Sequence, residues 1–365
     1  MREINVSTNE AGQRLDKLLR KYLKNANTAF IYKMLRKKNI VLNDKKAEGK
    51  EILNLGDSVK MYFSEETFAT MTGRTEQYSG SAETNQAAAA SASAQTASAG
   101  KNSAQTRRGA SSGNSSERRE KRAFDVEEFR KHIVYEDENL LVLNKPTGWL
   151  SQSDASGLPS VNERCLQYLM ATGALTEAQL QTFKPGIANR LDRNTSGLIL
   201  FGKTLPALQA LAGLLRDRTM EKYYLAIVCG DIDHAQRIDG YLAKDERTNR
   251  VEIRPQPFPD AAEIHTAYEP LKRSTDYTVL KVHLITGKTH QIRAHLRAIG
   301  HPIIGDPKYG RKDANAYYRT HGGVKSQLLH AWELHLPENL AGPLQNLAGQ
   351  TITAGPPKEF RQFLK

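Results

Sequence analysis

The sequence of 365 residues is poor in cysteine, in long apolar runs and in nucleotide-binding motifs. Its two cysteines, Cys165 and Cys229, exclude a disulfide framework and a cysteine zinc site, because they lie far apart in the chain. No stretch approaches 18 consecutive apolar residues, and the N-terminus lacks the apolar region of a signal peptide. Neither GxGxxG after a strand nor GxxxxGK[ST] occurs, so nothing indicates a nucleotide cofactor. We expect a soluble cytoplasmic protein without membrane contact.

The excess of positive charge is concentrated near the N-terminus. The chain contains 52 Lys and Arg against 40 Asp and Glu, a net charge of +12. Residues 1–63 contribute 14 basic and 7 acidic side chains, whereas residues 123–365 are almost balanced. A small basic module beside a nearly neutral domain is typical of a protein that docks on a polyanion, in the first place a nucleic acid.

A segment of low complexity separates these two parts. Between residues 79 and 116, 34 of 38 residues are Ala, Ser, Gly, Thr, Gln or Asn, and no large apolar side chain occurs. Such a composition cannot bury enough apolar surface to offset its ordering entropy. We therefore divide the chain into an N-terminal module (1–63), a flexible linker (64–122) that tethers it, and a C-terminal domain (123–365).

The N-terminal module has the pattern of two short helices on a small sheet. Apolar residues at helical spacing over residues 15–23 predict the first helix, and Asn27 or Thr28 begins the second. Residues 40–42 and 58–63 are predicted strands. The basic side chains are either RNA-phosphate contacts or an ordinary solvated face. The candidate RNA-binding residues are Arg14, Lys33, Arg36 and Lys37. The segments AGQRLDKLLRKYL, FIYKMLRKKNIVLN and LGDSVKMYF, in this order, resemble an S4 RNA-binding domain.

The C-terminal domain has more strand signals than helix signals, and several strands follow one another directly. We predict an α+β fold, with a mixed, largely antiparallel sheet flanked by helices. Polar, glycine-bearing segments stand at strand ends, where scaffolds usually carry their chemistry. These segments are LNKPTG (143–148), NRLDRNTSG (189–197), TGKTHQIRAHL (286–296) and GHPIIGDPKYG (300–310).

Within NRLDRNTSG a single carboxylate, Asp192, stands between Arg190 and Arg193, directly before an apolar strand. Neighbouring cations favour the ionised form of a carboxylate, which can serve as a nucleophile, a base or a metal ligand. The alternative is a structural aspartate that bonds the following turn. The pattern alone favours this alternative.

The histidines of the later segments suggest a metal site only at first sight. His290 and His295 are five residues apart, so they do not share one helix face, and no HExxH motif occurs. Arg293 is the better functional candidate, because a guanidinium can bind a phosphate or a catalytic carboxylate; otherwise it is a surface helix charge. In the predicted strand KYYLAIVCG, only one of Tyr223 and Tyr224 can face a given site. There a tyrosine ring either stacks on a base or belongs to the core.

Taken together, these segments resemble the RluA family of pseudouridine synthases. The resemblance runs from about residue 132 to residue 336 and rests on VLNKPTG, RLDRNTSGLILF, KYYLAIV, GKTHQIRAHL, GHPIIGDPKYG and QLLHAWEL, in the family's order. With an S4-like module in front, the chain is most similar to members that modify large-subunit (23S) ribosomal RNA. One departure is Asn189, where many members have His.

The resemblance implies a role for each matching residue. It makes Asp192 the catalytic aspartate, Tyr224 the tyrosine that stacks on the target base, and Arg293 the partner of the aspartate. Arg190 would enter the RNA where the base leaves, and Lys145 would line the same cleft. The family uses neither metal nor organic cofactor, the RNA base is flipped out, and we expect a monomer. The aspartate attacks C6 of the base or C1′ of the ribose, or removes a proton.

Three other functions remain to be compared with this one. A non-catalytic RNA-binding or ribosome-assembly protein would keep the fold without turnover. A synthase of the same fold would act on transfer RNA. A metal hydrolase that uses the histidines would lose activity with a chelator.

Overall fold

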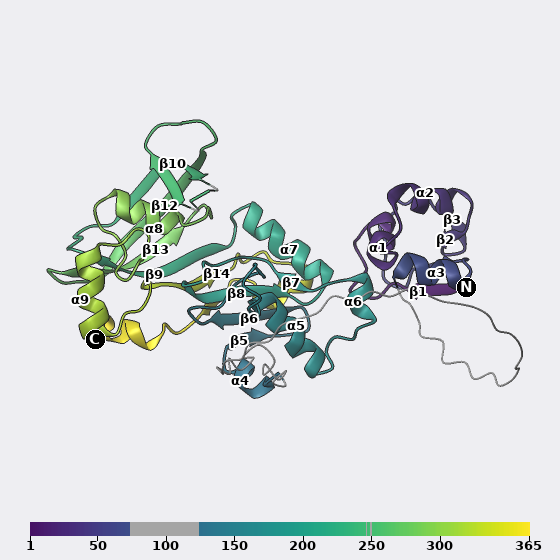
Figure 1. Ribbon diagram of the computed structural model, residues 1–365, viewed down its shortest axis with the longest axis horizontal. Coiled ribbons are helices and arrows are strands. Elements are labelled where there is room, and N and C mark those ends of the chain that lie inside the picture. Colours follow the sequence, from purple (N-terminus) through teal and green to yellow (C-terminus); the bar gives the residue numbers. More distant parts are fainter. Residues whose placement is uncertain (74–123, 246, 249) are drawn as a thin grey trace, which may run out of the picture.

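The computed structural model describes residues 1–73, 124–245, 247–248 and 250–365. Most of the expected linker (74–122) lies outside these residues. The described chain forms an N-terminal module and a larger domain built around a long sheet, and the module lies beside α6 of that domain (Figure 1). Within the described residues, no helix combines the length and the apolar character needed to cross a bilayer.

The N-terminal module contains the two helices predicted from the sequence. The side chain of Asn27 accepts a hydrogen bond from the amide of Phe30 (2.8 Å) and so begins the second helix. The helices cover a four-stranded sheet in the order β1-β4-β2-β3, and their apolar stripes are buried against it. The elements are β1 (Arg2–Asn5), α1 (Leu15–Tyr22), α2 (Thr28–Arg36), β2 (Ile40–Leu42), β3 (Lys45–Lys46) and β4 (Ser58–Met61).

The first residues of the expected linker belong to this module. Helix α3 (Glu65–Thr72) follows β4, and Ser64 caps it by accepting a hydrogen bond from the amide of Thr67. Phe68 is buried, and its ring centroid lies 5.1 Å from that of Phe63. The boundary at residue 63 is therefore wrong by about ten residues, because a capped helix with one buried aromatic ring does not show in the overall composition.

The C-terminal domain confirms the predicted α+β architecture. Its described strands pair in the order β11-β10-β12-β13-β9-β14-β8-β6-β5, with β15 on β14 and β7 on β8. All of these pairs are antiparallel except β14 with β8. The strands are β5 (Ile133–Glu136), β6 (Leu140–Lys145), β7 (Gly186–Ile187), β8 (Ser196–Gly202), β9 (Glu221–Cys229), β10 (Gln236–Asp245), β11 (Arg250–Arg254), β12 (Ala262–Arg273), β13 (Tyr277–Leu284), β14 (Leu329–His335) and β15 (Thr351–Thr353).

Helices pack around this sheet and complete one continuous apolar core. Helix α7 packs on β8, and α8 lies against β11 and β12. The helices are α4 (Val126–Arg130), α5 (Val161–Ala171), α6 (Gln179–Thr182), α7 (Leu205–Arg216), α8 (Gln291–Ala298), α9 (Lys312–Gly322) and α10 (Arg361–Leu364), with 3₁₀ turns at Gly342–Leu347 and Lys358–Phe360.

The parallel contact of β8 with β14 depends on a glycine. Gly197 has φ +113°, and a Cβ atom there would lie 2.1 Å from the carbonyl oxygen of Ala331. Only glycine allows two backbones to approach so closely. This contact fixes the start of β8, and with it the loop that carries Asp192, against the middle of the sheet.

The N-terminal module contacts the C-terminal domain directly, so it is not held by a tether alone. Thr182 of α6 donates a hydrogen bond to the buried carboxylate of Glu10, and the Lys21 ammonium lies 5.8 Å from the ring centroid of Phe183. Gln209 of α7 donates to the carbonyl of Gly12 (3.3 Å). The module is thus seated on α6 and α7.

Candidate active site

Asp192 lies in the loop between β7 and β8, at the floor of a cleft. The Ser151 hydroxyl donates to the carbonyl of Leu191 (2.7 Å) and accepts from its amide (3.0 Å), and the amide of Thr195 donates to the carbonyl of Asp192 (3.0 Å). These bonds fix the backbone on both sides of Asp192. Its carboxylate remains partly accessible, with a side-chain exposure of 27%.

Arg293 of α8 is the ionic partner of this carboxylate. Its Nη1 donates to Asp192 Oδ2 at 2.7 Å, across 101 residues of sequence. The guanidinium is almost completely buried. Burial alone would lower the pKa of Arg293, but the hydrogen bonds and charges of Asp306 and Asp192 raise it. Arg293 is therefore a permanent cation at this position.

Asp306 holds Arg293 in place and was not singled out from the sequence. Nε of Arg293 donates to Asp306 Oδ2 (2.7 Å) and Nη2 donates to Oδ1 (2.9 Å), which leaves Nη1 for Asp192. The Asp306 carboxylate is fully buried and also accepts from the amides of Lys308 and Tyr309. Burial raises the pKa of Asp306, but together these hydrogen-bond donors and the charge of Arg293 lower it by more, so the pKa lies below its usual value. The only sequence signal was its place in the glycine-bearing segment 300–310.

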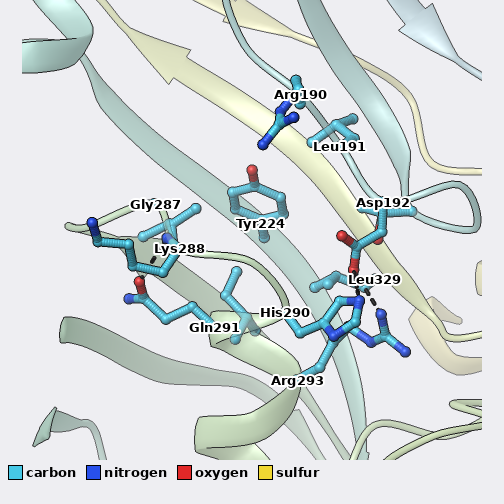
Figure 2. A pocket seen from close by; sticks show the side chains of 13 residues that line it. Arg190, Leu191, Asp192, Tyr224, Gly287, Lys288, His290, Gln291, Arg293 and Leu329 are labelled. Atoms are coloured by element: carbon cyan, nitrogen blue, oxygen red, sulfur yellow. Dashed lines mark hydrogen bonds and ion pairs between the residues drawn. The ribbon is translucent and has the colours of Figure 1, made fainter. Parts of the chain in front are cut away.

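Tyr224 of β9 lines the inner part of the cleft beside Asp192. Burial and the charge of Asp192 raise the pKa of its phenol, so the ring stays neutral. Tyr223 points to the opposite face of the sheet, where its ring centroid lies 4.7 Å from that of His283. This is the alternation expected from the strand pattern. Figure 2 shows the Tyr224 ring between Arg190 and the Asp192–Arg293 pair.

The cleft above this pocket is wide and rich in cations. It has a volume of about 820 Å³, and the inner pocket at Tyr224 and Asp192 adds about 100 Å³. A space of this size accommodates a nucleoside with its flanking phosphates, and a cationic lining attracts polyanions. The basic residues that line it are Arg190, Arg193, Lys222, Lys244, Lys288, Lys308 and Arg293.

Comparison with known proteins identifies this arrangement. A family model described as RNA pseudouridylate synthase matches residues 139–298. The ribosomal large subunit pseudouridine synthase D of Pasteurella multocida is 34% identical over 227 residues, which cover 60% of this chain and 67% of that protein. The chain belongs to the RluA family of RNA pseudouridine synthases. Members of this family are isomerases that convert uridine in RNA to pseudouridine.

Other relatives extend the similarity to the N-terminal module. The ribosomal large subunit pseudouridine synthase C of Vibrio cholerae is 29% identical over 329 residues, which cover 90% of this chain and 86% of that protein. Among solved structures, human RNA pseudouridylate synthase domain containing 4 has a TM-score of 0.51 at 21% identity and covers 64% of this chain and 92% of its own. This likeness shows that the pseudouridine synthase domain shares the same fold.

The structure brings Asp192, Tyr224, Arg293 and Arg190 into one cleft of the RluA-family domain. Arg190 is exposed at the rim, and its Nη1 donates to Gln152 Oε1 at 3.4 Å.

Lys145 does not lie in this cleft. Its ammonium is fully buried and donates to the carbonyls of Pro146 (3.1 Å), Trp149 (3.0 Å) and Arg193 (3.0 Å). Burial lowers the pKa of Lys145 to about 7, against the charge of Asp192, which raises it. The prediction of an RNA contact is wrong for this residue, because its three donors are used to hold two loops together.

Asn189, which stands where many family members have His, also has a structural place. Its amide donates to the carbonyl of Leu198 (3.2 Å) and accepts from the amide of Leu200 (2.8 Å). The side chain thus pairs with β8 in the manner of a backbone, and its hydrogen bonds position the strand that follows Asp192.

The predicted RNA-binding residues of the N-terminal module lie on its surface. Lys33, Arg36 and Lys37 of α2 and its C-cap are exposed, whereas Arg14 donates to both carboxylate oxygens of Asp16 at 3.1 Å. His295, one of the histidines considered for a metal site, is buried and forms a hydrogen bond with the hydroxyl of Thr266. Within the described ranges, no group of three His, Cys, Asp or Glu residues is arranged to hold a metal ion.

Proposed function

We propose that this enzyme isomerises specific uridines of large-subunit (23S) ribosomal RNA, with Asp192 as the reacting carboxylate. The observation that carries the proposal is the Asp192–Arg293 pair beside Tyr224, at the floor of a cationic cleft. Relatives named for the large ribosomal subunit support the choice of RNA, since the similarity to synthase C spans 90% of the chain. Such a substrate places the enzyme in the cytoplasm, and it works as a monomer.

The reaction breaks the N1–C1′ bond of uridine, rotates the uracil and forms the C5–C1′ bond. C5 loses a proton and N1 gains one, so atoms and electrons balance without redox or energy input. The base must first leave the RNA stack, which costs a few kcal/mol. Stacking on Tyr224 and entry of Arg190 into the gap offset this cost. Arg293 holds the Asp192 carboxylate in one orientation within the pocket through its hydrogen bond to Oδ2.

The N-terminal module, which we assign as an S4-type RNA-binding module, serves as a second point of attachment. Its exposed cations on α2 contact phosphates without reading sequence. A second attachment raises the effective concentration of the catalytic domain near its RNA.

The test is a modification assay on unmodified large-subunit ribosomal RNA, without added cofactor. Pseudouridines are mapped by carbodiimide adducts and primer extension, with Asp192→Asn in parallel. We expect new stops with the wild type and none with Asp192→Asn. Stops on transfer RNA alone would change the proposed substrate from ribosomal RNA to transfer RNA. Activity of Asp192→Asn would overturn the role of the carboxylate. Absence of stops on either RNA would favour a non-catalytic RNA-binding protein.

A further inference from the structure

We infer that His290 is a positioning residue for Asp192, acting through an N–H that faces the carboxylate; this rests on the proposed role of Asp192. His290 Nε2 lies 3.9 Å from Asp192 Oδ2, the same oxygen that accepts from Arg293. Both side chains start from the beginning of α8, three residues apart, and reach toward Asp192 (Figure 2).

The backbone of His290 is strained for a residue with a side chain. Its φ is +55° in the left-handed region, directly before α8. His290 is the N-cap residue of α8, but its ring makes no capping hydrogen bond to the α8 backbone. Strain of this kind persists where the surroundings hold the residue in a useful place, and it is concentrated at active sites. In this case the conformation turns the ring into the cleft.

The hydrogen-bond partner of the other ring nitrogen decides which nitrogen carries the proton. The amide of Val251 donates to the Tyr309 hydroxyl oxygen at 3.1 Å, so the hydroxyl proton points elsewhere. His290 Nδ1 lies 3.0 Å from this hydroxyl, and we assign Nδ1 as the acceptor of the hydroxyl hydrogen bond. A neutral imidazole with an accepting Nδ1 has its proton on Nε2. The N–H of His290 therefore faces Asp192.

Burial, together with two neighbouring cations, keeps the His290 ring neutral. Burial lowers its pKa most strongly, Arg293 and Lys308 lower it as well, and Asp192 and Asp306 work in the opposite direction. The net effect is a pKa below the ordinary value. Tyr309 is the remaining titratable group against the ring, with centroids 5.6 Å apart, and burial raises the pKa of its phenol. His290 thus donates from Nε2 without carrying a charge.

The two carboxylate oxygens of Asp192 therefore have different surroundings and different roles. Oδ2 is bound by Arg293 and faced by His290. Oδ1 has no hydrogen-bond partner among the residues that the structure describes, and it is the oxygen available to the uridine. Catalytic contacts that are long in a free enzyme commonly tighten when substrate closes the site. Two donors on one oxygen would then fix the direction in which the other oxygen reacts.

The experiment compares His290→Gly, His290→Gln and Tyr309→Phe in the full-length protein. Glycine keeps the left-handed backbone without a side chain, glutamine offers an amide N–H of similar reach, and phenylalanine removes the hydroxyl that selects the tautomer. We expect kcat of His290→Gly to fall about tenfold, with KM for RNA within about twofold. His290→Gln should recover most of kcat, and Tyr309→Phe should lose about threefold.

Rescue by glutamine and the split between kcat and KM separate positioning from a general loss of structure. A general loss of structure would lower the melting temperature of His290→Gly and would not be reversed in His290→Gln, whereas a lost donor to Asp192 should be reversed by the glutamine amide. His321→Gln, on the exposed face of α9, is the matched control and should resemble the wild type. Wild-type kcat in His290→Gly, or no recovery in a stably folded His290→Gln, would overturn the inference. Activity of Asp192→Asn would instead contradict the proposed role of Asp192, on which this inference rests.

Discussion

The two parts of the molecule use charge in opposite ways. On the N-terminal module, Lys33, Arg36 and Lys37 are exposed to water, where charge acts over a distance and is weakened by salt. In the catalytic domain, Arg293 and Asp306 are removed from water and joined by two hydrogen bonds, so their charge acts only at a fixed point. The same residue types thus provide long-range attraction in one part and fixed geometry in the other. Three predictions test this difference.

The largest effect is expected from neutralising a buried carboxylate in each part. Asp306→Asn leaves the Arg293 guanidinium without its two-point anchor, which should cost about 3–5 kcal/mol of stability and reduce kcat on the order of a hundredfold. Asp16→Asn is the matched variant, since Asp16 is also buried and is bound by Arg14. It should destabilise the N-terminal module and leave kcat at saturating RNA unchanged.

Steady-state kinetics and melting of the purified variants give both quantities. Equal loss of kcat in the two variants would contradict the assignment of fixed geometry to the catalytic domain alone.

The second prediction concerns acid, to which only the catalytic domain should respond strongly. His330 is fully buried between the Ser196 hydroxyl (2.8 Å) and the carbonyl of Ala354 (3.0 Å). Burial lowers its pKa to about 4, against the weaker opposite effect of the Ala354 carbonyl. Between pH 6.5 and about 4 the unfolded chain binds a proton that the folded domain does not, so stability falls as the pH falls. The loss is about 3 kcal/mol over this range.

Residues 1–73 contain no histidine. Hydrogen exchange at pH 7 and pH 5 should therefore show loss of protection around β14 and little change in α1 and α2. A parallel loss in both parts would show that the acid response has another origin.

The smallest effect is expected from the exposed cations. Replacing Lys33, Arg36 and Lys37 together with Gln should weaken RNA binding about tenfold and lower the slope of log Kd against log salt by about two. Turnover at saturating RNA should not change. The control is Arg130→Gln with Lys131→Gln, because these cations are paired with Glu127 and Glu128 on the catalytic domain. A control with the same loss of slope would mean that net charge, and not the position of the module, determines binding.

Local patterns in the sequence predicted the elements well. Apolar spacing identified α1 and α2, and the segment KYYLAIVCG was correctly predicted as a strand, β9. The resemblance to the RluA family implied that Asp192, Tyr224 and Arg293 would meet, although 101 residues separate the aspartate from the arginine. Spacing alone favoured a merely structural role for Asp192; the combination of segments pointed to the cleft.

What the sequence did not reveal depends on tertiary burial. Lys145 has the charge of a surface residue, yet β6 is covered on both faces, and three carbonyls replace water around its ammonium. Asp306 and His290 act through a guanidinium and a hydroxyl that reach them only in the folded domain. Helix α3 was missed because one buried ring, Phe68, anchors a short polar helix.

The place of β14 in the sheet also determines when this enzyme becomes active during its own synthesis. In the described part of the chain, the ladder passes from β9 to β8 through β14, which is translated after both of them. Before β14 pairs with both strands, the loop of Asp192 belongs to the part of the sheet around β8, and Tyr224 belongs to the part around β9. Pairing between such distant segments forms late in folding. The two halves of the site are therefore joined in a nascent chain only after β14 has been translated.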